Sequence, residues 1–292
     1  MMNTDGFADP WEQLRLLSDR PRNNLLMSLL ARHAPGSIIA EVGAGTGLWS
    51  LAAAALGARH VFAIEPSPLH QTISALVQAN GLSDRVTVVP AHVQEASPPR
   101  GGVDLAFSEL LNVDPFAEEV LEAMDAAASW LSPSGRLAPG ALTLHAALVS
   151  DAEPAAERRA ALAAVRAVAQ RTGLDLGPLM AQLRDPPPYC YAAPSVTVLG
   201  PPTQVFRIPL GQGVAPPPSV TVSLQASQAG IVGGVAVWFS ADYGVGVMAN
   251  PPEQPGHWGL HVSGWPRTQP VQAGEAIGVH VELEDGLVAS PA

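Results

Sequence analysis

The sequence contains no lysine and a single cysteine, Cys190. All fifteen basic residues are arginines, which excludes any mechanism that needs a lysine base or a lysine Schiff base. One cysteine cannot form an internal disulfide or complete a zinc site, and the eight histidines show no metal-ligand spacing. We therefore expect no metal, and most simply a cytoplasmic protein.

Charge is also scarce, at 14% of 292 residues, and the net charge is -11. This acidic balance disfavours non-specific binding to nucleic acid and favours cationic partners. The apolar residues never run uncharged for the roughly 20 positions that a membrane-spanning helix needs, and the N-terminus lacks the features of a secretory signal. The composition thus predicts a globular protein whose partners include neither nucleic acid nor a membrane.

The chain changes character near Pro139, because ten of its 29 prolines precede this residue and nineteen lie from it onward. Before it, short apolar runs alternate with helical patterns, which implies βαβ units and a mainly parallel sheet covered on both faces. The expected strands are 37–42, 60–65, 85–90 and 103–109, and the expected helices are 48–58, 70–81 and 116–131.

The second half is rich in Val, Ile and Trp, with turn residues between its apolar segments, a pattern typical of an antiparallel sandwich or barrel. Its expected strands are 142–149, 195–199, 203–210, 219–227, 233–241 and 276–284, and one helix is expected over 154–173. The fold class is thus α/β followed by mostly β. We place a Rossmann-like domain with an N-terminal helix in residues 1–138 and the β domain in 139–292.

A glycine-rich turn follows the first expected strand in the sequence IAEVGAGTG, residues 39–47. Gly43, Gly45 and Gly47 let the backbone pass close to a ligand at the carboxyl end of that strand. A dinucleotide fingerprint would need a further glycine where this chain has Leu48. The turn therefore suits a ligand without a pyrophosphate and disfavours a nicotinamide oxidoreductase.

An acidic residue, Glu65, directly follows the second expected strand. A carboxylate at this edge of the sheet can accept both hydroxyls of a ribose. S-adenosylmethionine is an adenosyl ligand without a pyrophosphate. Methyl transfer is therefore the leading chemistry.

Five segments in a fixed order carry a resemblance to a known family. They are LLSDRPRN at 16–23, EVGAGTG at 41–47, IEPS at 64–67, SELLNVDPFAEE at 108–119 and HW at 257–258. With this order and spacing the chain resembles the protein arginine methyltransferases over nearly its whole length. The resemblance implies a class I methyltransferase sheet, a β-barrel behind it, and a helical dimerisation arm at about 151–190 that forms head-to-tail homodimers.

The resemblance also implies roles for individual residues. The cofactor-binding residues would be Arg22, Glu41, Gly43, Gly45, Gly47, Glu65, Val93 and Gln94. Leu16, Asp19 and Trp258 would lie on the substrate side, and His257 would close the pocket and relay a proton. The chain departs from the family at Gly256, where members usually have threonine, and at Leu16, where many have methionine.

Glu109 and Glu118, nine residues apart, would grip the guanidinium of the substrate. Two carboxylates can bind its planar fork through charge-assisted hydrogen bonds and draw its charge toward the nitrogens that they contact. Glu109 follows the fourth expected strand, and Glu118 is expected to begin a helix whose amides favour an anion. Glu119 competes with Glu118 for this role, and Asp114 is a weaker competitor.

We therefore predict an S-adenosylmethionine-dependent arginine N-methyltransferase. Its acceptor would be free arginine or an arginine in a peptide or protein, and the sequence leaves both open. One alternative is a methyltransferase of another small molecule in secondary metabolism. Another is a non-catalytic scaffold that retains the fold.

Overall fold

The computed structural model describes residues 16–150, 153–182, 196–283 and 286–292. The chain divides into two compact units. The first comprises Met1–Leu142, Ile208–Ala215 and Ser240–Met248, and the second comprises Thr143–Arg207, Pro216–Phe239 and Ala249–Ala292. Cys190 and parts of the predicted arm lie outside the described residues. The domain boundary at 138 and the arm over 151–190 stay predictions.

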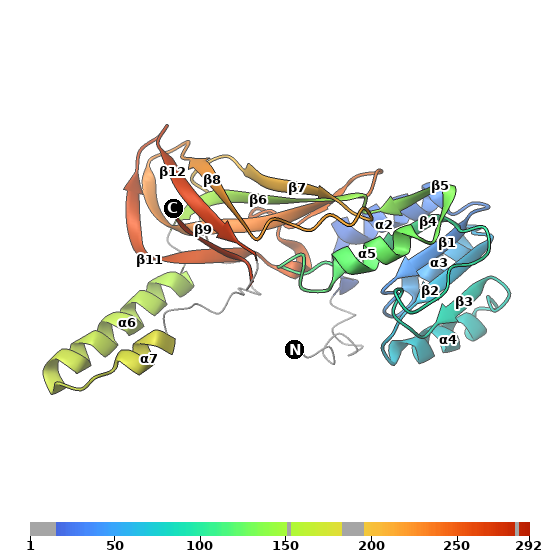
Figure 1. Ribbon diagram of the computed structural model, residues 1–292, viewed down its shortest axis with the longest axis horizontal. Coiled ribbons are helices and arrows are strands. Elements are labelled where there is room, and N and C mark those ends of the chain that lie inside the picture. Colours follow the sequence, from blue (N-terminus) through green and yellow to red (C-terminus); the bar gives the residue numbers. More distant parts are fainter. Residues whose placement is uncertain (1–15, 151–152, 183–195, 284–285) are drawn as a thin grey trace. The chain divides into compact units, whose positions relative to one another are not determined.

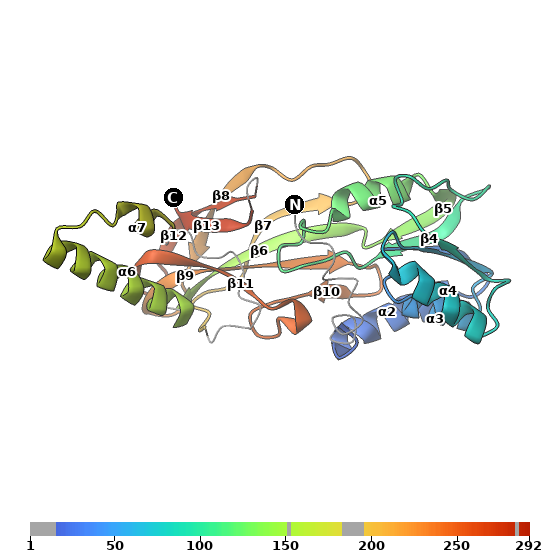
Figure 2. The same ribbon diagram turned by 90° about the horizontal axis from the view of Figure 1, so that it is seen from below.

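The first unit is built on a parallel five-stranded sheet with the order β3-β2-β1-β4-β5. Its strands are β1 (Ile38–Val42), β2 (His60–Ile64), β3 (Val86–Val89), β4 (Val103–Ser108) and β5 (Leu131–Ala138). Its helices are α2 (Arg20–His33), α3 (Leu48–Ala55), α4 (Leu69–Ala79) and α5 (Val120–Ala128). Figure 2 shows α2, α3 and α4 on one side of the sheet and α5 on the other.

The strand order positions the site. From β1 the chain continues to β2 on one side, and later returns to place β4 on the other side of β1. The carboxyl ends of β1 and β4 therefore flank a switch point, where ligands bind in open α/β sheets. Both strands are predominantly buried, as expected for a parallel sheet covered on both faces.

Helix α5 begins at Val120, later than the expected 116. Glu119 precedes it with φ 55 in the left-handed region, so the helix cannot extend back through this residue. The expectation that Glu118 begins the helix was therefore wrong. Glu118 lies in the loop between β4 and α5.

Antiparallel sheets follow along the chain, and Figure 1 shows their strands together with helices α6 and α7. One sheet has the order β10-β9-β6-β7, with β11 also paired to β9, and a second has the order β13-β12-β8. Their strands are β6 (Ala141–Ser150), β7 (Thr203–Pro209), β8 (Ser219–Gln225), β9 (Gly230–Asp242), β10 (Val247–Ala249), β11 (His261–Val271), β12 (Ala276–Glu282) and β13 (Val288–Pro291). Helices α6 (Glu153–Thr172) and α7 (Gly177–Gln182) and the short 3-10 helix η2 (Gly256–Trp258) complete the set.

The predicted fold class is confirmed, since a Rossmann-like parallel sheet precedes the antiparallel sheets. In the second unit, alternating residues of β6 and β9 pack with residues of β12 in one apolar core that includes Leu144, Val235 and Val279. The expected strand 195–199 is reduced to a bridge between Val149 and Val198. Among the described residues, no helix is both long and apolar enough to cross a membrane.

Candidate active site

The glycine turn after β1 has the conformation that the sequence predicts. Gly43, Gly45 and Gly47 have φ 72, 56 and 77, in the left-handed region that side chains disfavour. A Cβ on Gly43 would lie 2.6 Å from Cδ2 of Leu110, and one on Gly47 would lie 2.8 Å from Cγ2 of Ile73. These two glycines are therefore also required by packing within the protein.

Glu65, just beyond β2, connects the glycine turn to the end of that strand. Its Oε2 accepts a hydrogen bond from the backbone N–H of Gly45 at 2.7 Å, and its Oε1 accepts one from the N–H of Ser67 at 2.9 Å. The side chain is buried. Its carboxylate is thus fixed at the carboxyl edge of the sheet.

Glu41, on β1, is a buried carboxyl at the same edge. The Oγ of Ser50, on α3, donates a hydrogen bond to its Oε2. Burial raises the pKa of Glu41 to about 8, although the hydrogen bonds with Ser50 and the positive charge of Arg22 oppose this shift. The site therefore holds a carboxyl that a cationic ligand would help to ionise.

Arg22, on α2, is buried and forms an ion pair with Glu109. Its Nε donates to Oε2 of Glu109 at 2.6 Å, and its Nη2 donates to the same oxygen. Asp19 caps α2 by accepting a hydrogen bond from the N–H of Arg22 at 3.1 Å. The structure thus brings together three of the predicted site residues.

Glu118 lies near Glu109 in the loop after β4. Burial raises the pKa of Glu118 to about 8, and the negative charge of Glu109 adds to this shift. The side-chain amide of Asn112 donates a hydrogen bond to Oε1 of Glu118 at 3.0 Å. Glu119 is exposed, and Asp114 accepts the N–H of Phe116 within a local turn. Of these acids, Glu118 is the one whose pKa the charge of Glu109 raises.

Tyr243, a buried residue between β9 and β10, also contributes to this edge, although no motif in the sequence points to it. Its hydroxyl donates a hydrogen bond to the carbonyl of Ser108 at 2.7 Å, and the Ser108 hydroxyl donates to the carbonyl of Val42 at 2.8 Å. Ser108 is the last residue of β4 and directly precedes Glu109. No local pattern could reveal this contact, since 135 residues separate the pair.

Val93 and Gln94 follow β3, where Val93 is buried in the core of the first unit and Gln94 is exposed. Leu16, at the start of the described residues, is half-buried and its carbonyl accepts the N–H of Asp19. Their contacts with a ligand stay predictions.

His257 and Trp258 belong to the second unit. Trp258 is buried against Phe239, with ring centroids 5.3 Å apart and an edge-on angle of 84°. The ring of His257 lies 4.0 Å from that of Trp258. Gly256 has φ 63, a conformation that explains glycine where the family usually has threonine. The predicted roles of His257 in closing the pocket and relaying a proton stay predictions.

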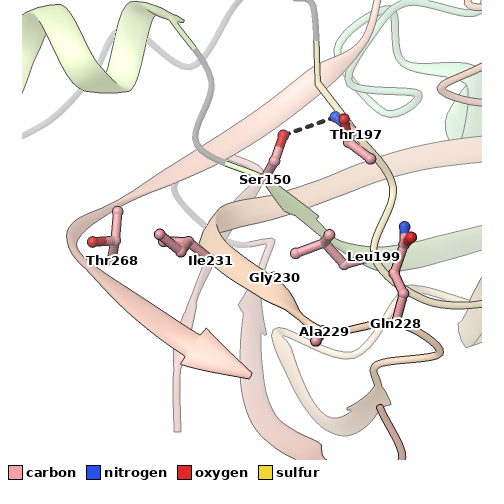
Figure 3. A pocket seen from close by; sticks show the side chains of 8 residues that line it. All are labelled: Ser150, Thr197, Leu199, Gln228, Ala229, Gly230, Ile231 and Thr268. Carbon is pink, nitrogen blue, oxygen red and sulfur yellow. Dashed lines mark hydrogen bonds between the residues drawn. The ribbon is translucent and has the colours of Figure 1, made fainter. Parts of the chain in front are cut away.

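A hollow of about 470 Å³ lies in the second unit (Figure 3). It is lined by Ser150, Thr197, Leu199, Gln228, Ala229, Gly230, Ile231 and Thr268, none of them ionisable near neutral pH. Figure 3 shows the N–H of Thr197 bonded to the Ser150 hydroxyl, a distance of 2.8 Å. Within the described ranges, no group of three or more His, Cys, Asp or Glu could hold a metal ion. The acid-rich edge of the first unit remains the candidate active site.

Residues 39–135 match the family model of a methyltransferase domain. Over 97% of its length the chain is 30% identical to an arginine N(omega)-methyltransferase of Streptomyces achromogenes subsp. streptozoticus, covering 81% of that protein. The chain belongs to the protein arginine methyltransferase family. It is an S-adenosylmethionine-dependent arginine N-methyltransferase, so the predicted activity and methyl donor are confirmed.

Solved structures agree with this family fold. The crystal structure of Arabidopsis thaliana protein arginine methyltransferase 10 matches with a TM-score of 0.81 and 21% identity, over 95% of this arginine methyltransferase and 88% of that chain. The Trypanosoma brucei PRMT1 enzyme-prozyme heterotetrameric complex with AdoHcy matches with a TM-score of 0.78 and 19% identity, over 94% and 88% of the two chains.

The residues at the sheet edge fit S-adenosylmethionine. Gly43, Gly45 and Gly47 carry no side chains, so the backbone of the left-handed turn leaves room for a ligand close to it, and Glu65 is fixed beside the turn. The buried carboxyls of Glu41 and Glu65 suit a ligand with a cationic amine, a cationic sulfonium and ribose hydroxyls. The sheet edge of this arginine methyltransferase therefore carries carboxyl groups of the kind that can bind this cofactor.

Proposed function

We propose that Glu109 and Glu118 bind the arginine guanidinium at the carboxyl edge of the first sheet. One observation carries this proposal: two carboxyls lie close enough for the charge of Glu109 to raise the pKa of Glu118. Two carboxyls that repel each other favour a cation between them. Arg22 partly offsets this repulsion through its ion pair with Glu109.

The chemistry needs such a pair, because a guanidinium is always charged and its nitrogens are poor nucleophiles. When Glu109 and Glu118 accept its N–H bonds, they draw the positive charge toward the nitrogens that they contact and leave the remaining nitrogen richer in electrons. The bound cofactor supplies an electrophilic methyl group on a positively charged sulfur. The carboxylates also offset the repulsion between two cations, about 4 kcal/mol at 4 Å and an effective dielectric of 20.

We assign the supporting roles as follows. Glu41, Glu65 and the glycine turn hold the cofactor, with Val93 and Gln94 at the adenine edge. Arg22 orients Glu109. When the cofactor is bound, Arg22 also binds the carboxylate of the cofactor. Asp19, Leu16 and Trp258 flank the acceptor. His257 relays the proton that the guanidinium loses on methylation.

We propose free arginine as the acceptor. The support is the match to a relative whose name specifies arginine itself, along nearly the whole chain. The acidic surface, with net charge -11, attracts a small cationic amino acid. Incubation with labelled cofactor and either free arginine or an arginine-rich peptide, followed by mass spectrometry, tests this assignment. Methylation of the peptide alone would refute it.

Glu109 and Glu118 together form what we call the clamp. Its role is tested with Glu109→Gln and Glu118→Gln, which keep the side-chain shape but remove the charge. We expect kcat/KM to fall by at least about 100-fold in each, because a charged hydrogen bond in the transition state is lost. Glu119→Gln is the matched control, since Glu119 is exposed and adjacent. Full activity of either clamp variant would show that the assignment is wrong.

We further propose a head-to-tail homodimer formed through the arm. Exposed apolar side chains occur on α2 and α3, at Met27 and Leu48, each 41% exposed, and on the α6–α7 segment at Val168, Leu174 and Leu179. Apolar surface of this kind favours association. Leu174→Glu combined with Leu179→Glu should give monomers in light scattering, whereas Val247→Glu, at a residue that is 61% exposed, should not. A dimer that survives the double change would contradict this proposal.

We also propose that the enzyme acts in the cytoplasm. The support is its single cysteine. One cysteine forms no internal disulfide, so an oxidising compartment would not stabilise the fold. Fractionation of cells that express the tagged full chain would test this location. Recovery outside the cytoplasmic fraction would contradict it.

A further inference from the structure

Asn112 has one side-chain orientation that satisfies both of its neighbours. Its Oδ1 accepts a hydrogen bond from the backbone N–H of Val113 at 2.7 Å, and its Nδ2 donates to Oε1 of Glu118 at 3.0 Å. The Val113 N–H can only donate, so the amide oxygen must face it and the NH₂ group must face the carboxylate. The backbone therefore aims a donor at Glu118.

We propose that Asn112 is a positioning residue, which holds the Glu118 carboxylate in place to receive the guanidinium. This inference rests on the proposed clamp role of Glu118. The two clamp carboxyls are held differently, because Glu109 is paired with the charged Arg22 and Glu118 is bound by a neutral amide. A neutral donor orients Glu118 without forming an ion pair with it, so the carboxyl stays available to pair with the guanidinium.

The surroundings of Glu118 explain why such a donor is needed. Burial and the charge of Glu109 both raise the pKa of Glu118, and the hydrogen bond from Asn112 lowers it. Arg22 is bound to Glu109, and burial together with the negative charge of Glu109 raises the pKa of Tyr243 well above its ordinary value. The amide of Asn112 is thus the direct hydrogen-bond donor that favours the ionised form of Glu118.

Two substitutions separate positioning from a merely structural role in the turn. Asn112→Asp keeps an oxygen for the Val113 N–H but replaces the donor with a second carboxylate facing Glu118. Asn112→Ala removes both contacts. We expect kcat/KM for arginine to fall about 10-fold in Asn112→Ala and about 100-fold in Asn112→Asp. The acid limb of the pH profile should move upward in both variants, and further in Asn112→Asp.

If Asn112 only stabilises the turn, Asn112→Ala should lose more kcat/KM than Asn112→Asp. Asn112→Asp should then resemble the wild type, with an unshifted pH profile. That result would overturn the inference while the wild type still methylates arginine. Absence of methylation in the wild type would instead refute the proposed function. Asn80→Asp is the matched control, because Asn80 is an exposed amide at the end of α4 and should leave kcat/KM unchanged.

A double-mutant cycle covers the case in which Asn112→Asp does not fold. Asn112→Ala should cost about 10-fold in the wild type and almost nothing in Glu118→Gln, because the cycle isolates the pairwise interaction. Equal losses in both backgrounds would overturn the positioning role. Cofactor binding by calorimetry verifies that each variant used in the cycle is folded.

Discussion

Both Nε and Nη2 of Arg22 donate to a single oxygen of Glu109, Oε2, with the Nε bond at 2.6 Å. Arg22 comes from α2 and Glu109 follows β4, so the pair ties an N-terminal helix to the loop that carries the clamp. Both side chains are nearly buried, with exposed fractions of 6% and 10%. The ion pair is therefore shielded from water, which makes each partner dependent on the other.

Replacing Arg22 should affect stability and activity together. Arg22→Gln leaves Glu109 buried without its cation, and we expect a loss of about 3 kcal/mol in the free energy of unfolding. We expect kcat/KM to fall at least about 100-fold, with weaker cofactor binding. Urea denaturation and steady-state kinetics measure both effects. Arg59→Gln removes the same charge at an exposed position and should change neither; an unaltered Arg22→Gln would contradict this explanation.

The glycine turn allows a matched pair of substitutions. Gly43 and Gly36 have nearly equal φ, 72 and 71, so alanine strains the backbone equally at both, by about 1–2 kcal/mol. At Gly43 the new Cβ also meets Leu110, whereas at Gly36 no atom of the described residues lies within 4 Å of it. We expect Gly43→Ala to lower the free energy of unfolding by about 1–3 kcal/mol more than Gly36→Ala does, as measured by thermal unfolding.

Only the Gly43 change should also lower methylation, because Leu110 directly follows Glu109. Gly36→Ala should retain wild-type kcat/KM, since the residue lies in the turn between α2 and β1. Equal free energies of unfolding for the two variants would show that Leu110 can move away from the new Cβ without loss of stability. In that case the glycine would be needed for its backbone conformation alone.

Local patterns sufficed for much of the fold. The bounds predicted for the first four parallel strands agree with the structure to within one residue at each end, since short apolar runs bounded by turns need no tertiary information. Strand β5 was missed because its sequence LSPSGRLA contains Pro, Ser and Gly, and only pairing with β4 makes it a strand. Strand β11 was missed for a similar reason, with two prolines in HVSGWPRTQPV.

The site, like the fold, combines residues that sequence motifs predict with residues whose contacts depend on the tertiary structure. Arg22, Glu65 and Glu109 stand in motifs whose order is visible in the sequence; Glu65 and Glu109 directly follow β2 and β4, and Arg22, on α2, pairs with Glu109. Asn112 lies in the motif SELLNVDPFAEE, but its hydrogen bond with Glu118 depends on how the loop after β4 folds back. Tyr243 comes from a distant hairpin, so no sequence pattern links it to Ser108.

The raised pKa of Glu41 predicts how stability changes with pH. A carboxyl whose pKa rises from 4.5 in the unfolded chain to about 8 in the folded one binds more protons when folded. Its contribution to the free energy of unfolding is therefore full below pH 4.5 and is lost as pH rises to about 8. The loss for this group is on the order of a few kcal/mol.

Glu41→Gln removes this dependence, since an amide does not titrate and still offers an oxygen to Ser50. We expect the variant to differ only slightly from the wild type in urea unfolding at pH 5 and to be clearly more stable at pH 8, while it binds the cofactor more weakly. Glu122→Gln, at an exposed site on α5, controls for loss of charge. A stability difference that does not change between pH 5 and pH 8 would refute the assignment.

Tyr243→Phe tests whether the end of β4 must be held for catalysis. The hydroxyl of Tyr243 is buried and its pKa lies well above 10, so it remains a donor to the Ser108 carbonyl at any working pH. Phenylalanine keeps the ring but leaves this buried acceptor without that donor, at a cost of about 1–3 kcal/mol in unfolding free energy.

Because Ser108 directly precedes Glu109, we expect kcat for arginine methylation to fall about 10-fold in Tyr243→Phe. The KM for S-adenosylmethionine should stay near the wild-type value, since the glycine turn and Glu65 are untouched. Ser108→Ala, which removes the second bond to Val42 but keeps the Ser108 carbonyl, gives the comparison. If Tyr243→Phe loses stability and keeps full kcat, then Glu109 is oriented by Arg22 alone, and the hairpin that carries Tyr243 contributes only to folding.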